Sequence, residues 1–254
     1  MGEWTLSAYA DLIRKAIKAG YKPMPVADYL RAPSSNALIL RHDVDRFPNN
    51  AVAMGAAEAD LGIRSTYYVR HRRQGFPADA IATLNQQGHE IGYHYEVLSR
   101  ARGDPNLAVS LFKSELDKLR AKVPVVTTTA HGSPMSKWDN RLFWEHAKPS
   151  EFDLVGDGYR DIDFLNVAYF TDTGRTWADT GVNLRDRVDG PGALTNEVVA
   201  LQDLIGFIQS HRAMSVCLQT HPERWNTYWA SRIRSMSWDY STNMAKTLLK
   251  LVVA

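Results

Sequence analysis

Residues 37–45 read ALILRHDVD, an apolar run that passes directly into charged side chains. Three further apolar runs end in a similar way, in EIGYH, VVTTTAH and VCLQTH, which reach His94, His131 and His221. In parallel α/β folds the carboxyl ends of the strands meet on one face, where ligands bind. The pattern therefore predicts that four separate segments bring carboxylates and imidazoles to one site.

Between these segments, short runs rich in β-branched and aromatic residues alternate with longer segments of helical spacing. This alternation is typical of repeated βα units around a parallel sheet, so the expected fold class is α/β. We expect seven strands, at residues 37–40, 66–69, 90–93, 125–129, 152–155, 166–170 and 214–218. Helical periodicity disappears in the Gly- and Asp-rich stretch 153–192, which we interpret as strands with long loops.

Caps and breakers mark the boundaries of four of the helices. The expected boundaries are Gly20 after the first helix, Pro77 and Gly88 around the second, Asp104-Pro105 before the third, and Thr195 or Asn196 before the fourth. An apolar stripe near the carboxyl end is expected to cover the barrel, with a partner protein as the alternative. Its members are Trp225, Trp229, Ile233 and Met236.

The chain has 254 residues, and we expect one domain over residues 1–254, with a helical extension at 1–36 and further helices at 226–254. A chain of this length buries roughly 70–75% of its unfolded surface, so its core needs neither disulfides nor a structural metal. Any metal is therefore expected to serve chemistry.

Charge and cysteine content exclude several classes of function. The 30 Lys+Arg and 28 Asp+Glu residues nearly balance, which leaves no basic field for nucleic acid. Cys217 is the single cysteine, so neither a disulfide framework nor a cysteine-based zinc site is expected. No apolar window is long enough to span a membrane, and the N-terminal stretch does not resemble a signal peptide. We expect a cytoplasmic protein.

The two aspartates of RHDVD are candidates for chemistry because strand alternation sends Asp43 and Asp45 to the same side, about 6–7 Å apart. A structural alternative is that Asp45 caps the following helix and that Asp43 pairs with Arg41 or Arg46. A histidine with a carboxylate is a common set of ligands for a divalent metal, which makes His94 a candidate ligand. His89 precedes its strand, so we expect a structural role at the opposite face.

These residues resemble motifs of a known family, the polysaccharide deacetylases of the NodB homology type, carbohydrate esterase family 4 and its relatives. The resemblance covers roughly residues 37–225, and GHEIGYH and RHDVD are its most specific segments. It implies a distorted seven-stranded (β/α) barrel that hydrolyses the N-acyl group of amino sugars with a divalent metal ion, zinc being the first choice.

The resemblance also implies roles for single residues. Asp43 matches the family's catalytic base, and Asp45 and His94 match metal ligands. The family's second motif has another histidine four residues after the first, where this chain has Leu98, which cannot bind a metal. His131 stands where the third motif has an arginine, so we expect it either to complete the metal shell or to orient Asp43.

The remaining motifs imply further assignments. Pro134 in AHGSP matches a groove-lining proline, and His221 in CLQTH matches the general acid. The fourth motif is matched poorly, and Asp172 is the candidate for its acid, on the substrate side of the site. The aromatic residues that we expect near the substrate are Tyr95, Trp177 and Trp225, together with Trp138 and Tyr159.

The expected function is removal of an acetyl or formyl group from an amino sugar. Its substrate would be a small-molecule, nucleotide-linked or lipid-linked precursor of a surface polysaccharide such as lipopolysaccharide O-antigen. Two alternatives stay open. A metal-independent C–N hydrolase on the same fold is favoured by Leu98. A non-catalytic carbohydrate-binding protein is opposed by the retained acids and histidines.

Overall fold

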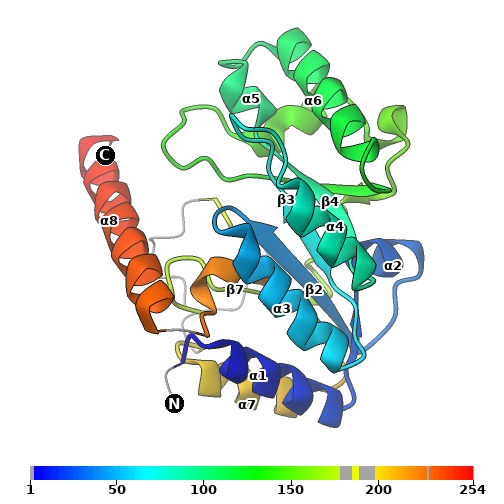
Figure 1. The fold of residues 1–254 in the computed structure, drawn as a ribbon, viewed down its shortest axis with the longest axis vertical. Coiled ribbons are helices and arrows are strands. Elements are labelled where there is room, and N and C mark those ends of the chain that lie inside the picture. Colours follow the sequence, from blue (N-terminus) through cyan, green and yellow to red (C-terminus); the bar gives the residue numbers. More distant parts are fainter. Residues whose placement is uncertain (1–2, 178–184, 189–197, 228, 254) are drawn as a thin grey trace.

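Parallel strands form one curled sheet at the centre of the computed structural model, which describes residues 3–177, 185–188, 198–227 and 229–253 (Figure 1). The strand order is β6-β5-β4-β3-β2-β8-β7, and every pairing is parallel. The strand bounds are β2 Ala37–Val44, β3 Thr66–Val69, β4 Glu90–Tyr95, β5 Thr127–Ala130, β6 Gly156–Asp157, β7 Val167–Thr171 and β8 Ser215–Thr220. The expected α/β class, with seven parallel strands in a barrel-like curl, is confirmed.

The barrel is open. Among the described residues, no pairing joins β6 to β7, so the seven strands make a partial barrel. A short strand that the sequence did not indicate, β1 Lys22–Met24, adds to the first half of β2.

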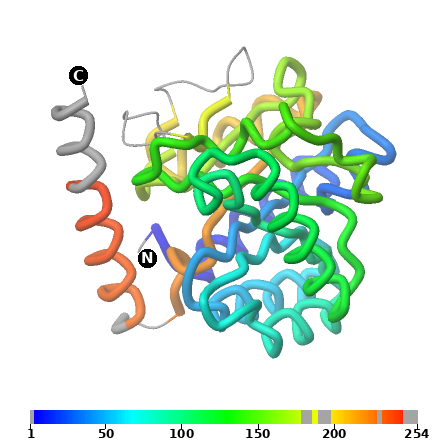
Figure 2. Tube along the Cα trace, turned by 90° about the horizontal axis from the view of Figure 1, so that it is seen from above, coloured from blue at the N-terminus to red at the C-terminus, as the bar shows by residue number. Residues whose placement is uncertain are grey.

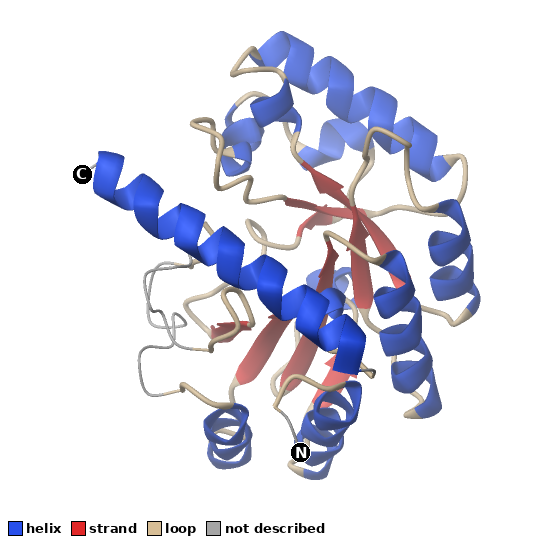
Figure 3. Cartoon of the chain, turned by 60° about the vertical axis from the view of Figure 1, so that its left-hand side comes forward, coloured by secondary structure: helices blue, strands red, loops and turns tan. Residues whose placement is uncertain are grey.

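Helices lie outside the sheet (Figure 3). Their bounds are α1 Leu6–Lys18, α2 Val26–Arg31, α3 Pro48–Asp60, α4 Ala78–Gln86, α5 Val97–Arg100, α6 Pro105–Arg120, α7 Leu201–Ser210 and α8 Trp229–Val253. Three 3-10 helices complete the order, η1 Asn140–Glu145, η2 Pro149–Phe152 and η3 Pro222–Arg224. No helix in the described part of the chain is both long and apolar enough to cross a bilayer.

The caps predicted from the sequence are present. Gly20 and Gly88 follow α1 and α4 with φ of 98° and 88°, conformations that favour glycine. The Asp104 carboxylate accepts hydrogen bonds from the backbone N–H groups of Asn106 and Leu107 at the start of α6. The helix start expected at Thr195 or Asn196 lies outside the described residues, and α7 begins at Leu201.

Strand alternation separates two faces of β2. Ala37 and Ile39 join an apolar cluster with Tyr68 and Cys217 on the inner, concave face. Leu38 and its even-numbered neighbours pack into the larger core between the sheet and the helices. Asp43 therefore completes the inner row, at the carboxyl edge of the sheet.

Two expectations about elements are wrong. The strand expected at 152–155 does not form: η2 ends at Phe152, residues 153–155 are irregular, and only Gly156–Asp157 pairs as β6. Ile233 and Met236 do not cover the barrel. Both are exposed on α8, which lies along one side of the molecule, whereas Trp225 is buried before α8 begins (Figure 2). The side chain of Trp229 lies outside the described residues.

Candidate functional site

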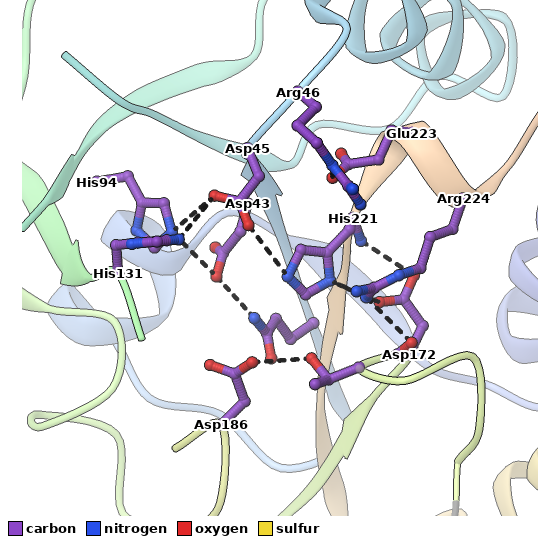
Figure 4. Close-up of polar contacts among 12 residues, drawn as sticks. Asp43, Asp45, Arg46, His94, His131, Asp172, Asp186, His221, Glu223 and Arg224 are labelled. Atoms are coloured by element: carbon purple, nitrogen blue, oxygen red, sulfur yellow. Dashed lines mark hydrogen bonds and ion pairs between the residues drawn. The ribbon is translucent and has the colours of Figure 1, made fainter. Parts of the chain in front are cut away.

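A cavity of about 490 Å³ opens at the carboxyl edge of the sheet. The five acids and histidines that the sequence singled out as catalytic or metal-binding all line it: Asp43, Asp45, His94, His131 and His221. Pro134, expected in the groove, also lines it. Strands far apart in the sequence thus place these side chains facing one another (Figure 4).

Asp45, His94 and His131 form a candidate metal site. Their potential ligand atoms all lie within 4.8 Å of one another. The Asp45 Oδ1 atom is 3.6 Å from His94 Nε2 and 3.5 Å from His131 Nε2. Imidazole nitrogens and a carboxylate oxygen are ordinary zinc ligands, and three protein ligands leave a position for water or substrate.

The outer nitrogens of both imidazoles are held by acceptors. His94 Nδ1 lies 3.1 Å from the Thr129 carbonyl oxygen, which can only accept, so this nitrogen carries the proton. His131 Nδ1 lies 3.2 Å from Glu96 Oε2. Each Nε2 is therefore directed at Asp45, in the arrangement that typically supports metal-bound histidines.

Asp45 shows that this cluster is incomplete on its own. Its Oδ1 atom is buried and has no hydrogen-bond partner. A buried acceptor without a partner costs about 1–3 kcal/mol, and more when the group is charged. A cation held by the three residues removes that cost, so the donor set fits a divalent metal. Asp45 does not cap the next helix, because the N-cap of α3 is Phe47 and it has no side-chain cap.

Leu98 belongs to α5, is buried in the apolar core and does not line the cavity. His131, which follows β5, completes the candidate triad instead. Of the two roles expected for His131, the geometry favours metal binding.

The local charges act on the pKa values of these groups. Burial lowers the pKa of His94 to about 4, although Asp43 and Asp45 oppose that effect. Burial also disfavours protonation of His131, but Asp45 and Glu96 outweigh it and raise that pKa to about 9. The pKa of Asp45 lies well below its ordinary value, because His131 and Arg70 overcome the effect of burial.

Asp43 is held by a guanidinium on its own strand. Arg41 donates two hydrogen bonds to it, Nε to Oδ1 at 3.0 Å and Nη2 to Oδ2 at 2.8 Å, and Gln219 Nε2 donates a third at 2.6 Å. Burial would raise the pKa of Asp43, but Arg41 and His94 lower it to about 2. Asp43 therefore does pair with Arg41, as the structural alternative expected. It also lines the cavity, where its Oδ2 atom lies 3.7 Å from His94 Nε2.

His221 is oriented by Asp172. The Asp172 carboxylate accepts hydrogen bonds from His221 Nδ1 at 2.6 Å, from Arg224 Nη1 at 2.6 Å and from Trp225 Nε1 at 2.9 Å. Burial and Arg224 disfavour the protonated imidazole, but Asp172 and Asp45 outweigh them and raise the pKa of His221. His221 Nε2 remains directed at the cavity, 3.9 Å from Asp45 Oδ2.

The substrate-binding assignments need correction. Asp172 is fully buried and holds His221, so a substrate cannot reach it. Tyr95 faces the opposite side of β4 from His94, because side chains alternate along a strand, and it packs on Phe112. Trp177 and Trp225 pack against Trp4. None of these four lines the cavity.

Other cavity residues were not anticipated. They are mainly arginines and residues of α8: Arg46, Arg70, Arg72, Arg185, Arg224, Trp238, Asp239, Thr242 and Asn243. Arg70 directly follows β3, and this place after an apolar strand is a sequence signal for a residue of the cavity. The sequence gives no such signal for the α8 residues, because their position depends on how that helix packs on the body.

Protein-family models, curated proteins and solved structures were all compared with the chain, and none of the three comparisons gave a match.

Proposed function

We propose that this protein is a metal-dependent hydrolase that removes an acetyl or formyl group from the nitrogen of an amino sugar, on a barrel of the NodB type. One observation carries the proposal. A candidate metal triad, an ionised aspartate and a histidine that a buried aspartate holds in place face the same cavity. Amide hydrolysis needs a group that polarises the carbonyl, a base that activates water and an acid that protonates the nitrogen. The reason is that the carbonyl is a poor electrophile and the amine a poor leaving group.

Asp45, His94 and His131 would hold the metal, and zinc suits their nitrogen and oxygen donors. When bound, such an ion polarises the amide carbonyl and lowers the pKa of a water molecule to about 7. Glu96 and the Thr129 carbonyl fix the two imidazoles from behind.

Asp43 is suited to accept the proton of the attacking water. Its pKa of about 2 keeps it ionised at neutral pH. Arg41 and Gln219 hold the carboxylate in one orientation at the edge of the cavity. The carboxylate is therefore present in the form that a general base requires.

His221 is suited to donate a proton to the departing nitrogen. Asp172 and Asp45 raise its pKa, which makes the imidazole a better holder of a proton than a free histidine, and Asp172 keeps Nδ1 engaged so that Nε2 faces the cavity. The acid and the base thus have environments that move their pKa values apart, the arrangement expected for paired proton-transfer groups.

The test combines product release with metal content. We expect the purified protein to contain near-stoichiometric zinc or another divalent ion and to release acetate or formate from a panel of N-acylated amino sugars. We expect Asp45→Ala and His94→Ala to lose the ion. Hydrolysis that is insensitive to chelators would support the metal-independent hydrolase instead. Sugar binding without product release would support the non-catalytic protein.

A further inference from the structure

The carboxyl-terminal helix α8 is attached to the body on one side only. The Asp239 carboxylate accepts hydrogen bonds from Arg46 Nη2 and Arg175 Nε, both at 2.8 Å. Ser235 Oγ donates to the Glu223 carbonyl oxygen at 2.6 Å. Since residues 235 and 239 are one helical turn apart, these contacts define the face of α8 that is turned to the body.

The same side of α8 also borders the cavity. Trp238, Thr242 and Asn243 line it together with Asp239. Beyond this contact α8 stands apart from the sheet and its helices in both views of the whole chain (Figures 1 and 2). The helix is therefore one wall of the cavity and, on its other side, an outer surface of the molecule.

That outer surface is apolar. Ile233, Tyr240 and Met244 are 55%, 69% and 51% exposed. Their spacing of seven and four residues puts them on one stripe of the helix, away from Ser235 and Asp239. Met236 is also exposed at its margin. Soluble monomers seldom expose a contiguous run of large apolar side chains, so such a run indicates an interaction surface.

The helix is also basic. Residues 229–253 contain Arg232, Arg234, Lys246 and Lys250 and a single acid, Asp239. Asp239 is already engaged by arginines of the body. Among the described residues, no carboxylate pairs with Arg232 or Arg234. The Arg234 guanidinium lies 4.1 Å from the centre of the Phe47 ring and is therefore turned to the body, and by sequence α8 carries a net charge of +3.

We propose that α8 docks the protein on the surface of a membrane that contains anionic phospholipids. A helix with an apolar stripe, exposed aromatic side chains and a basic polar side lies in the interface plane, with its apolar residues among the acyl chains and its cations at the headgroups. At 1.5 Å per residue, the 25 residues of α8 extend over roughly 37 Å. This length gives several turns of contact beyond those that hold the body.

A second copy of the chain fits this surface less well. Two copies of α8 paired about a twofold axis would bring like charges together, because the helix offers no free acid to its partner. Anionic headgroups supply the missing negative charge.

A consequence follows for the substrate, and it rests on the proposed function. With α8 on the membrane, the cavity on its other side lies about one helix diameter, roughly 10–12 Å, from the headgroup region. A sugar attached to a lipid carrier could then enter the cavity while its chains remain in the bilayer. Between the nucleotide-linked and lipid-linked precursors, this placement favours the lipid-linked one.

Cosedimentation of the full-length protein with vesicles tests the docking. We expect binding to vesicles of phosphatidylcholine and phosphatidylglycerol (3:1), weak binding to phosphatidylcholine alone, and release by high salt. The variant Ile233→Ser/Tyr240→Ser/Met244→Ser should lower the partition coefficient at least tenfold. Leu107→Ser/Leu142→Ser/Leu165→Ser, which changes three exposed leucines elsewhere, is the matched control and should bind as the wild type does.

Three results would overturn the docking. They are no preference for anionic vesicles, an equal loss in the two serine variants, and a dimer in lipid-free light scattering that the α8 variant alone dissociates. Circular dichroism of both variants checks their folding. Because the assay contains no substrate, a failure of the proposed hydrolase activity would leave the vesicle result unchanged, and the two proposals can fail separately.

Discussion

Two buried polar clusters lie on opposite faces of β2. The first surrounds Glu58, on the outer face next to α3, and we call it the Glu58 cluster. The Glu58 carboxylate accepts hydrogen bonds from four side chains: Tyr9 and His42 at Oε1, Ser65 and Tyr67 at Oε2. His89 Nε2 completes the cluster with a hydrogen bond to the Gly55 carbonyl oxygen. Both oxygens of Glu58 are therefore satisfied within the protein.

The second cluster is the cavity site on the inner face. It also combines carboxylates with histidines, but Asp45 Oδ1 has no hydrogen-bond partner and the side chains border open space. Residue types alone do not separate the two clusters. The two clusters differ in how completely their polar atoms are hydrogen-bonded. A closed network stabilises the fold, whereas a buried oxygen without a hydrogen-bond partner at a cavity marks a candidate ligand site.

The strongest way to separate the clusters is to compare one substitution in each. Asp43→Asn should lower kcat by roughly 10²–10⁴-fold, because the amide cannot accept the proton of water. Glu58→Gln should leave kcat within a few-fold. Product release from an N-acylated amino sugar measures both, and elemental analysis should find the metal retained in Asp43→Asn. Near-full activity of Asp43→Asn would refute its role as the base.

On stability the two substitutions should have the opposite order of effect, with Glu58→Gln lowering the free energy of unfolding more than Asp43→Asn does. Glu58→Gln directs an amide NH₂ at side chains that already donate and leaves His42 without its carboxylate. A buried polar group that is left without its hydrogen-bond partner costs about 1–3 kcal/mol, and more when the lost partner is charged. Urea unfolding measures the loss. An unchanged midpoint would mean that the Glu58 cluster does not stabilise the fold.

The Glu58 cluster should also make stability depend on pH. Burial raises the pKa of Glu58, but His42 and His89 outweigh it and lower the pKa from 4.5 to about 2. A carboxyl with a lowered folded-state pKa stabilises the protein above its unfolded pKa and loses that effect as the pH falls. We expect a loss of at most about 3 kcal/mol between pH 5 and 2. The contribution should be absent when Glu58→Gln is titrated in parallel by urea unfolding.

The smallest expected effect tests the support behind the metal site. Glu96→Gln removes the charge that faces His131 Nδ1 and keeps the ligand itself. Losing such a partner typically weakens metal binding 10–100-fold. Competition for zinc with a chromogenic chelator measures the affinity, and the exposed Glu151→Gln is the control. Equal affinities would mean that Glu96 does not support the site.

Much of the site could be predicted from the sequence because strands have a simple period. The apolar runs that end in Asp43, His94 and His221 predicted parallel strands whose carboxyl ends meet. All three side chains line one cavity. The caps at Gly20 and Asp104 were equally local, since each depends on a few consecutive residues.

Tertiary structure decided the rest. Whether Tyr95 faced substrate or core depended on which side of β4 was the inner one. Trp177 is buried against Trp4, which is far from it in the sequence, near the amino terminus. The partner of Asp172 and the exposure of Ile233 likewise depended on contacts between distant segments. Sequence by itself determined which residues stand at strand ends, because that is a matter of local periodicity. Only the packed chain decided which atoms were left without a partner, because satisfaction is a property of neighbours in space.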